Sequence, residues 1–309
     1  MSTEPLSTAP SAEVSTVTRV LGVIRTMRPH QWVKNLFVIA PVFFAKNLTD
    51  MSILGGAAGA FAVFCLLAGS IYTLNDLLDV EADRIHPVKR SRPIASGVVP
   101  VSLARVVFVV LIVVSLLGCA LLPRSFAVVA IAYFVLNTTY SIKLKKFAYV
   151  DVGCIATGFV LRVLAGGAAT QTPVSGYMLA CTLLLALFLG FGKRLHELGS
   201  AQAEKQRAAL RHYSRKALLR ALMLTGISSV VAYVAFTLDP HTKTFFRSEW
   251  LWLTSIHPLV GVLRFVHLIR SRPDAESPTQ EMLRDTPFML NLVMWIAEVV
   301  VIVYHLRPT

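Results

Sequence analysis

The chain has 309 residues, of which 55% are hydrophobic and only 15% are charged. This composition is too apolar for a soluble domain of this size and predicts an integral membrane protein. The net charge of +13 would also suit nucleic-acid binding, but the basic residues lie between apolar segments, which argues against a nucleic-acid partner.

The apolar segments predict an all-α, polytopic membrane protein. Nine of them reach membrane-spanning length, at roughly 33–48, 53–75, 101–122, 125–142, 150–169, 175–192, 217–238, 250–269 and 287–306. With a cytoplasmic N-terminus, 24 of the 30 Lys and Arg residues fall on the cytoplasmic side, which predicts a multi-pass protein of the cell (inner or plasma) membrane whose C-terminus lies outside. We expect residues 1–18 to be a disordered tail and residues 19–309 to be one transmembrane domain.

A polar face opens the first expected span. On a helix of about 100° per residue, the side chains that share this face are Arg28, Gln31, Trp32 and Asn35, with Lys34 beside them. Arg, Lys and Trp favour the membrane interface, so anchoring explains part of the pattern, whereas amide side chains fit anchoring less well. The candidate substrate-binding residues here are Arg28, Gln31, Lys34 and Asn35.

The stretch from Asn75 to Asp83 places four carboxylates directly after a long apolar run. On a helix, Asp76, Asp79 and Asp83 share one face, Asn75 borders it, and Glu81 lies on the opposite side. Oxygen ligands grouped in this way suit Mg²⁺, which completes its coordination with water and substrate phosphates. A solvated acidic helix end is the alternative interpretation.

A basic loop follows the acidic stretch. Pro87 is expected to end the helix, and the loop beyond it carries Lys89, Arg90 and Arg92. These charges could neutralise a bound phosphate while Mg²⁺ bridges its other side. The ordinary positive charge of a cytoplasmic loop explains the same residues, and the pattern does not decide between the two.

The fifth expected span contains two ionisable residues, Asp151 near its start and Arg162 within it. They lie about 16 Å apart along a helix axis, too far for a direct pair, so each must have another partner. A charged residue inside a span usually faces a cavity or the bundle interior, so Arg162 is a functional as well as a structural candidate. Gly166 and Gly167 predict close helix packing.

The sixth expected span ends in a basic pair, Lys193 and Arg194, which is followed by Glu197. The spacings of four and three residues favour ion pairs within one helix. Such pairing does not forbid a catalytic role.

Two of these motifs, together with a further stretch at the end of the fourth expected span, resemble the UbiA superfamily of intramembrane prenyltransferases. They are N-D-x-x-D-x-x-x-D at 75–83, K-R-x-R-P-I at 89–94 and Y-S-x-x-L-K at 140–145, the last of which adds Tyr140 and Lys145 to the candidate site. The resemblance covers nearly the whole chain after the tail. It implies a nine-helix bundle with an active-site cavity on the cytoplasmic side.

Within the superfamily, the chain looks most like the decaprenyl-phosphate phosphoribosyltransferases. This likeness rests on R-P-x-Q-W-x-K-N at 28–35, L-R-x-x-A-G-G at 161–167 and G-K-R-x-x-E-L at 192–198. Aromatic prenyltransferases of the superfamily carry a second Asp-rich motif after the sixth span, where this chain has Lys193, Arg194 and Glu197. This departure argues against a prenyl diphosphate as donor.

The resemblance implies Mg²⁺-dependent transfer of 5-phosphoribosyl from phosphoribosyl diphosphate to a polyprenyl phosphate of the decaprenyl type, for synthesis of cell-envelope glycan precursors. The implied metal ligands are Asn75, Asp76, Asp79 and Asp83, the three aspartates being the catalytic residues. The 5-phosphate would be bound either by Lys89, Arg90 and Arg92 or by Lys193 and Arg194. The lipid phosphate would be bound by Arg28, Lys34 or Arg162.

A phosphate monoester is already an anionic nucleophile, so catalysis would rest on positioning and on stabilising the leaving diphosphate. Two other functions stay open. One is transfer of a prenyl group from prenyl diphosphate to an aromatic acceptor. The other is lipid or solute transport, which the clustering of polar groups at span ends disfavours. The lipid chain length and the oligomeric state, a homo-oligomer included, are also open.

Overall fold

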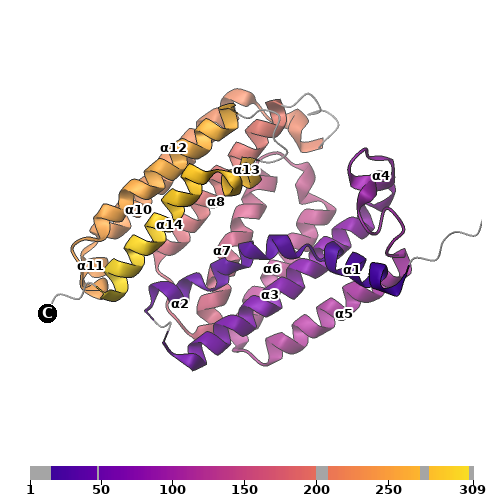
Figure 1. Ribbon diagram of the computed structural model, residues 1–309, viewed down its shortest axis with the longest axis horizontal. Helices are drawn as coiled ribbons and strands as arrows, with labels where there is room; N and C mark the ends of the chain where they lie inside the picture. Colours follow the sequence, from indigo (N-terminus) through magenta and orange to yellow (C-terminus); the bar gives the residue numbers. More distant parts are fainter. Residues whose placement is uncertain (1–14, 47–48, 200–207, 272–277, 306–309) are drawn as a thin grey trace, which may run out of the picture. The chain divides into compact units, whose positions relative to one another are not determined.

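The computed structural model describes residues 15–46, 49–199, 208–271 and 278–305 (Figure 1). Every regular element in these ranges is a helix, which confirms the predicted fold class. The chain divides into two compact units. Unit 1 comprises Met1–Trp32 and Cys65–Ser115, and unit 2 comprises Val33–Phe64 and Leu116–Thr309.

Eight helices in the described residues are long and apolar enough to cross a membrane. They are α3 (Met51–Leu78), α5 (Val101–Ala120), α6 (Arg124–Ile142), α7 (Val150–Thr170), α8 (Gly176–Gly199), α10 (Arg215–Leu238), η5 with α12 (Leu251–Ser255 and Ile256–Ser271), and α14 (Thr286–Val300) with the start of η6 (Val301–His305). They coincide with eight of the nine expected spans, so the protein is a multi-pass membrane protein.

The first expected span, 33–48, has a different form. It consists of the 3-10 helix η1 (Pro29–Val38) and the five-residue helix α2 (Ala40–Phe44), and its last two residues lie outside the described ranges. Pro41 lies in the first turn of α2, where its missing N–H and its ring are tolerated. The same proline would break a helix running through it, and this explains why the span is not one continuous α-helix.

Helix α1 (Thr16–Thr26) begins before the expected end of the N-terminal tail. Its N-cap is Ser15, whose hydroxyl accepts a hydrogen bond of 3.2 Å from the backbone N–H of Thr18. The helix therefore starts three residues earlier than the tail of 1–18 allowed. Residues 1–14 lie outside the described ranges.

Unit 1 contains α1, the second half of α3, the short helices α4 (Val80–Ile85) and η2 (Lys89–Ser91), and the first part of α5. Its apolar cluster is built on Ile94, Val99 and Ala104, each about 1% exposed, and Leu77 and Val80 pack against it. The loop after α4 is therefore folded onto the ends of α3 and α4. This packing fixes the backbone that carries the basic residues of the loop.

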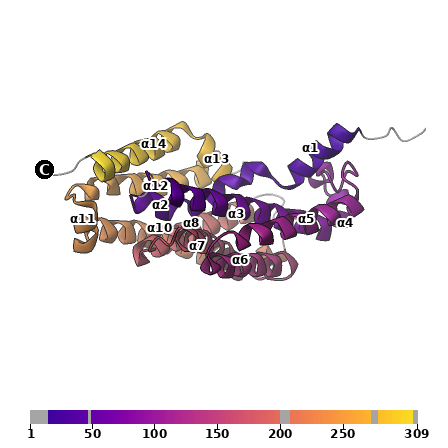
Figure 2. The same cartoon turned by 90° about the horizontal axis from the view of Figure 1, so that it is seen from below.

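Unit 2 contains α2, α6, α7, α8 and α10 to α14, where α11 is Pro240–Phe246 and α13 is Pro278–Arg284. Helix α8 packs along α10 and α7, and α7 packs along α6 (Figure 1). Helix α14 lies alongside α12, as Figure 2 also shows. One core cluster joins Val152 of α7, Phe188 of α8, Leu218 and Leu222 of α10, and Phe265 of α12. Unit 2 also includes the short 3-10 turns η3 (Leu144–Lys146) and η4 (Ala208–His212).

The predicted close packing at Gly166 is confirmed. A Cβ atom at this position would lie 1.8 Å from the carbonyl oxygen of Val38, at the end of η1. Only glycine allows the two backbones to approach so closely. Gly166 thus sets how η1 and α7, which both carry candidate site residues, pack together.

Candidate functional site

The acidic stretch is not one continuous helix. Helix α3 ends at Leu78, Asp79 has φ −98° and ψ 6°, and α4 begins at Val80. Helical spacing nevertheless continues, because the N–H of Asp79 donates to the carbonyl of Asn75 at 3.0 Å and the N–H of Asp83 donates to that of Asp79 at 2.8 Å. The expected common face is therefore largely preserved across the junction.

Burial separates the carboxylates of this stretch. Asp76 and Asp83 are each 3% exposed, and Asp79 is half-buried. The side chain of Glu81 is 78% exposed and pairs with Arg84 of the same helix at 2.8 Å. Asp76 and Asp83 lie on the buried side of α3 and α4, and Glu81 faces outward.

Two arginines meet the buried carboxylates. Nη1 of Arg92 lies 2.6 Å from Oδ2 of Asp83 and 3.1 Å from Oδ1 of Asp76, so one guanidinium bridges both. Nη2 of Arg28 lies 2.6 Å from the same Oδ1 of Asp76, and its guanidinium stacks on the ring of Tyr72, 5.0 Å from the centroid. These charge-assisted contacts offset the cost of burying two carboxylates.

The local sequence explains how Arg92 reaches the acidic stretch. His86 and Arg92 each precede a proline and each has an extended backbone, the conformation that a following proline favours. The chain therefore leaves α4 at Pro87, turns through η2, and runs extended again into Pro93. Arg90 is exposed and Lys89 is half-buried in η2.

The residues of this site fit a hard divalent cation. The candidate metal-ligating atoms are oxygens. Two buried carboxylates, one at the end of α3 and one in α4, are close enough to contact the same guanidinium, that of Arg92. Mg²⁺ needs only one or two carboxylates, because water and substrate phosphates complete its coordination. As placed, the described part of the chain does not gather three Asp, Glu, His or Cys side chains into a metal-binding group. Arg92 bridges Asp76 and Asp83 instead.

A second polar cluster lies in unit 2 around Arg162, which is 6% exposed. Its Nε donates to Oδ1 of Asn35 at 2.8 Å, its Nη2 to the hydroxyl of Tyr133 at 2.7 Å, and its Nη1 to the carbonyl of Gly158 at 3.0 Å. The guanidinium also stacks on the rings of Tyr133 and Phe159. The prediction that Arg162 has a partner other than Asp151 is confirmed. Among the described residues, no partner of Arg162 is a carboxylate. Its guanidinium is therefore hydrogen-bonded, but its positive charge is not neutralised.

Tyr133 is a residue that the sequence analysis missed. It is 2% exposed and contacts Arg162 with both its hydroxyl and its ring. Its spacing carried a usable signal, since Tyr133 lies two helical turns before Tyr140 and therefore on the same face of α6. Tyr140 itself is half-buried near the end of α6.

A third cluster surrounds Asp151, which is completely buried at the start of α7. Nε of Arg194 lies 2.8 Å from its Oδ2 in an ion pair, and the hydroxyl of Tyr213 donates to its Oδ1. Burial, and then the hydrogen bond to Asp151, raise the pKa of Tyr213, so its hydroxyl stays protonated as a donor. Asp151 thus has the separate partner that was predicted.

The basic pair at the end of α8 splits into two environments. Arg194 pairs with Glu197 as well as with Asp151, and its side chain is 2% exposed. Lys193 is 42% exposed, with its Nζ 4.0 Å from Oε1 of Glu197. The predicted ion pairs within α8 are confirmed, but only Lys193 presents its charge to the surroundings.

The other candidates occupy short helical segments. Gln31 and Lys34 lie in η1, and Lys145 lies in η3, all three half-buried. The backbone N–H of Gln31 donates to the carbonyl of Arg28 at 2.8 Å, which ties the start of η1 to the residue that contacts Asp76. Arg28 has a positive φ of 52°, so α1 and η1 meet at a left-handed residue.

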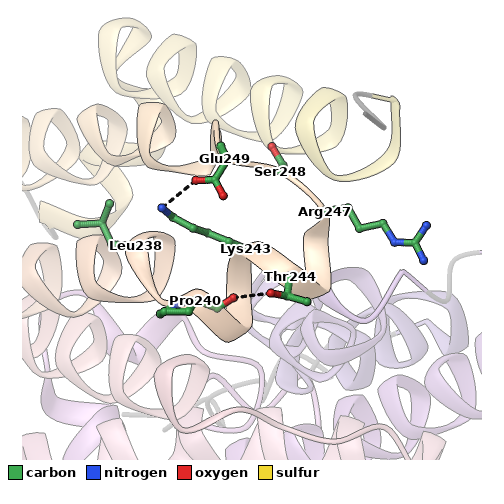
Figure 3. Close-up of a pocket in the computed structure, with 7 residues that line it drawn as sticks. All are labelled: Leu238, Pro240, Lys243, Thr244, Arg247, Ser248 and Glu249. Carbon is green, nitrogen blue, oxygen red and sulfur yellow. Dashed lines mark hydrogen bonds and ion pairs between the residues drawn. The ribbon is translucent and has the colours of Figure 1, made fainter. Parts of the chain in front are cut away.

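A hollow beside α11 contains none of the candidate residues. It has a volume of about 420 Å³ and is lined by Leu238, Pro240, Lys243, Thr244, Arg247, Ser248 and Glu249 (Figure 3). Lys243 is paired with Glu249 at 2.9 Å, and Arg247 points away from the hollow. This hollow offers no concentrated positive charge for a phosphate. The cavity expected on the cytoplasmic side stays a prediction.

Known proteins resemble the chain over most of its length. Residues 36–293 match the UbiA prenyltransferase family. A decaprenyl-phosphate phosphoribosyltransferase of Mycobacterium tuberculosis is 34% identical over 91% of this chain and 93% of that protein. The protein of the same name from Corynebacterium glutamicum is 31% identical over 92% and 87%, respectively.

Solved structures share the fold. A UbiA homolog from Archaeoglobus fulgidus bound to DMAPP and Mg²⁺ has a TM-score of 0.68 at 20% identity, covering 92% of this chain and 100% of that one. A UbiA homolog from Aeropyrum pernix has a TM-score of 0.61 at 14% identity, covering 88% and 97%. Sequence match, relatives and fold agree, and the chain belongs to the UbiA prenyltransferase family.

Proposed function

We propose that this protein is a membrane phosphoribosyltransferase that uses phosphoribosyl diphosphate as donor and a polyprenyl phosphate as acceptor. The relatives of 31–34% identity, which match more than nine-tenths of the chain, support this reaction. The structural observation that best supports the proposed reaction is a pair of buried carboxylates, Asp76 and Asp83, at the end of an apolar helix. Two arginines contact these carboxylates. Diphosphate is released, and the product serves cell-envelope glycan synthesis.

The donor's diphosphate binds at the acidic stretch of unit 1. Asn75, Asp76, Asp79 and Asp83 hold Mg²⁺. Bound Mg²⁺ stabilises negative charge on the leaving diphosphate. Arg28 and Arg92 already lie beside these carboxylates, and Lys89 and Arg90 lie in η2 just before Arg92, so positive side chains flank the place where the diphosphate would bind.

These residues bind and orient the donor without taking a proton from the acceptor. The acceptor phosphate is anionic at neutral pH, so attack at the anomeric carbon needs no general base. The work of the protein is to hold the two reacting groups in line and to exclude water. For this reason the proposed site needs acidic side chains for Mg²⁺ and basic side chains for phosphates, but no side chain that acts as a general base.

The buried charge of Arg162 supports a role in binding the acceptor phosphate. Its partners are an amide, a hydroxyl and a carbonyl, which leave a net positive charge within α7. An anionic head group would supply the missing counter-charge. Lys34 and Arg28 are the other candidates for this group. Gln31, Tyr140 and Lys145 complete the proposed substrate-binding set.

Lys193 is the better-exposed member of the basic pair and is proposed to bind the 5-phosphate. The basic loop of unit 1, with Lys89, Arg90 and Arg92, is the alternative. Arg194 belongs to the same motif, with its guanidinium held by Asp151 and Glu197. The eight membrane-spanning helices support a lipid acceptor that reaches the protein from the bilayer. The reaction is placed on the cytoplasmic side of the cell membrane, with the N-terminus on that side. A C-terminus outside, as expected from nine spans, requires that the segment of η1 and α2 also crosses the membrane in addition to the eight long helices.

The test uses the purified full-length protein in nanodiscs. It is incubated with Mg²⁺, phosphoribosyl diphosphate labelled in the ribose, and polyprenyl phosphates of several chain lengths, and the organic phase is analysed for label. Transfer that needs both substrates and fails in Asp83→Asn supports the proposal. No transfer, together with activity on a prenyl diphosphate and an aromatic acid, would overturn it in favour of prenyl transfer.

A further inference from the structure

Four charged side chains of unit 1 form a closed, neutral group. Asp76 and Asp83 contribute two negative charges, and Arg28 and Arg92 contribute two positive ones. Both carboxylates are 3% exposed, while the side chains of Arg28 and Arg92 are 24% and 26% exposed. The carboxylates are therefore fixed in the interior, and the arginines reach them from a more open side.

Arg92 occupies the position from which a cation would bridge the two carboxylates. A single nitrogen, Nη1, contacts Oδ1 of Asp76 and Oδ2 of Asp83. Magnesium binds carboxylate oxygens at about 2.0–2.1 Å, so it cannot bridge this pair of oxygens while Nη1 lies 2.6 Å from one of them. Arg92 and a bridging metal ion therefore compete for the same oxygens.

Arg28 differs from Arg92 in what it contacts. It reaches Asp76 alone, and its guanidinium is also held on the ring of Tyr72. Arg92 is carried by an extended segment just after η2 and bridges α3 to α4. Of the two arginines, only Arg92 contacts both carboxylates, so Arg92 occupies the bridging position that a cation would need.

The charge balance decides when Arg92 leaves. A divalent cation entering alone would give the group a net charge of +2 and leave the guanidinium without a partner, which is costly in a partly buried site. A diphosphate that enters with the cation supplies negative charge and a bidentate acceptor for arginine. Each charged group then keeps a partner of opposite charge. The carboxylates contact the metal ion in place of Arg92, and Arg92 contacts the diphosphate in place of the carboxylates.

We propose that Arg92 is an internal counter-cation that holds Asp76 and Asp83 until a diphosphate arrives, so that metal and diphosphate bind cooperatively. This inference rests on the proposed metal site and adds the order of events there. It makes Arg92 a positioning residue for the free enzyme and a ligand for the donor afterwards. The free protein then binds divalent cations weakly, which protects the site from occupation by metal alone.

The test measures Mn²⁺ binding by electron paramagnetic resonance on the full chain in nanodiscs, with and without methylene diphosphonate, after subtraction of protein-free samples. In the wild type, the diphosphonate is expected to tighten Mn²⁺ binding roughly ten-fold or more, and Mn²⁺ is expected to tighten diphosphonate binding by the same factor. In Arg92→Gln, Mn²⁺ alone is expected to bind roughly ten-fold tighter, and the coupling shrinks accordingly. Arg84→Gln, on the exposed face of α4, is the matched control and keeps wild-type values.

Two results separate the inference from the function on which it rests. If Arg92→Gln binds Mn²⁺ alone no tighter than the wild type, or if the wild type binds Mn²⁺ equally with and without diphosphonate, Arg92 is not a counter-cation. If Asp76→Asn and Asp83→Asn bind Mn²⁺ as the wild type does under both conditions, the metal site itself is wrong. The wild-type comparison holds even if Arg92→Gln fails to fold, which thermal unfolding in nanodiscs reports.

Discussion

Arg162 and Asn35 are joined by a hydrogen bond of 2.8 Å from Nε to Oδ1, although 127 residues separate them in the sequence. Asn35 is 1% exposed, so its amide is an interior ligand of the guanidinium and not an interfacial anchor. An amide oxygen stabilises a cation without neutralising it. The protein therefore maintains a buried positive charge in α7, an arrangement that suits an anionic ligand.

We predict that Asn35→Asp lowers transfer activity without lowering the stability of the protein. A carboxylate at this position would pair with Arg162 and cancel the charge that is proposed to bind the acceptor phosphate. The KM for polyprenyl phosphate is expected to rise about ten-fold or more, with the thermal midpoint unchanged or higher. Asn35→Leu is the control, because it removes the hydrogen bond and lowers the midpoint instead. Unchanged kinetics in Asn35→Asp would remove Arg162 from the acceptor site.

In the acidic stretch, we predict that substitutions of the buried and half-buried aspartates lower activity and that substitution of the exposed Glu81 does not. Asp76→Asn, Asp79→Ala and Asp83→Asn are each expected to lower kcat by at least about a hundred-fold, because they remove ligands of the proposed Mg²⁺ site. Glu81→Gln should retain nearly full activity, since Glu81 is exposed and contacts only Arg84 among the interactions described for it. The measurement is the transfer assay on variants whose size-exclusion profile matches the wild type. Full activity of the Asp79 variant would contradict its assignment as a ligand.

Substitutions of the neighbouring residues Lys193 and Arg194 are expected to have different effects, on donor binding for Lys193 and on stability for Arg194. Arg194→Met leaves Asp151 and Glu197 without their common cation, which should destabilise the protein by about 3–5 kcal/mol. Lys193→Met should change stability by no more than about 0.5 kcal/mol, because the side chain is well exposed, while raising the KM for phosphoribosyl diphosphate. Thermal unfolding and donor titrations of the two variants test this split. A normal KM in Lys193→Met would leave the 5-phosphate to the basic loop of unit 1.

Elements with strong local signals were predictable from the sequence. Eight spans follow from runs of apolar residues, and the common face of Asp76 and Asp83 follows from helical spacing. The exposure of Glu81 agrees with its position on the opposite side of that helix. In each case the feature depends on residues within a few turns of one another.

Features that depend on distant residues were not predictable. The break in the first span follows from Pro41, a local signal within that span, but the packing of Val38 on Gly166 joins residues far apart in the chain. Asp151 needed a partner by its charge, but the sequence could not name Tyr213, which lies 62 residues away. Helical spacing defines which residues share a face, and only the packing of helices decides what that face contacts.

Gly166 provides a prediction on stability that is independent of the proposed function. Gly166→Ala places a Cβ atom 1.8 Å from the carbonyl oxygen of Val38, so η1 and α7 must separate. We expect a loss of about 1–3 kcal/mol or more, read as a lower thermal midpoint in nanodiscs. Gly153→Ala is the matched control on the same helix, because no heavy atom lies within 4 Å of its added Cβ. Since Asn35 lies on η1 and Arg162 on α7, Gly166→Ala should also weaken acceptor binding. Equal midpoints for the two variants would show that the contact between η1 and α7 is not as close as described.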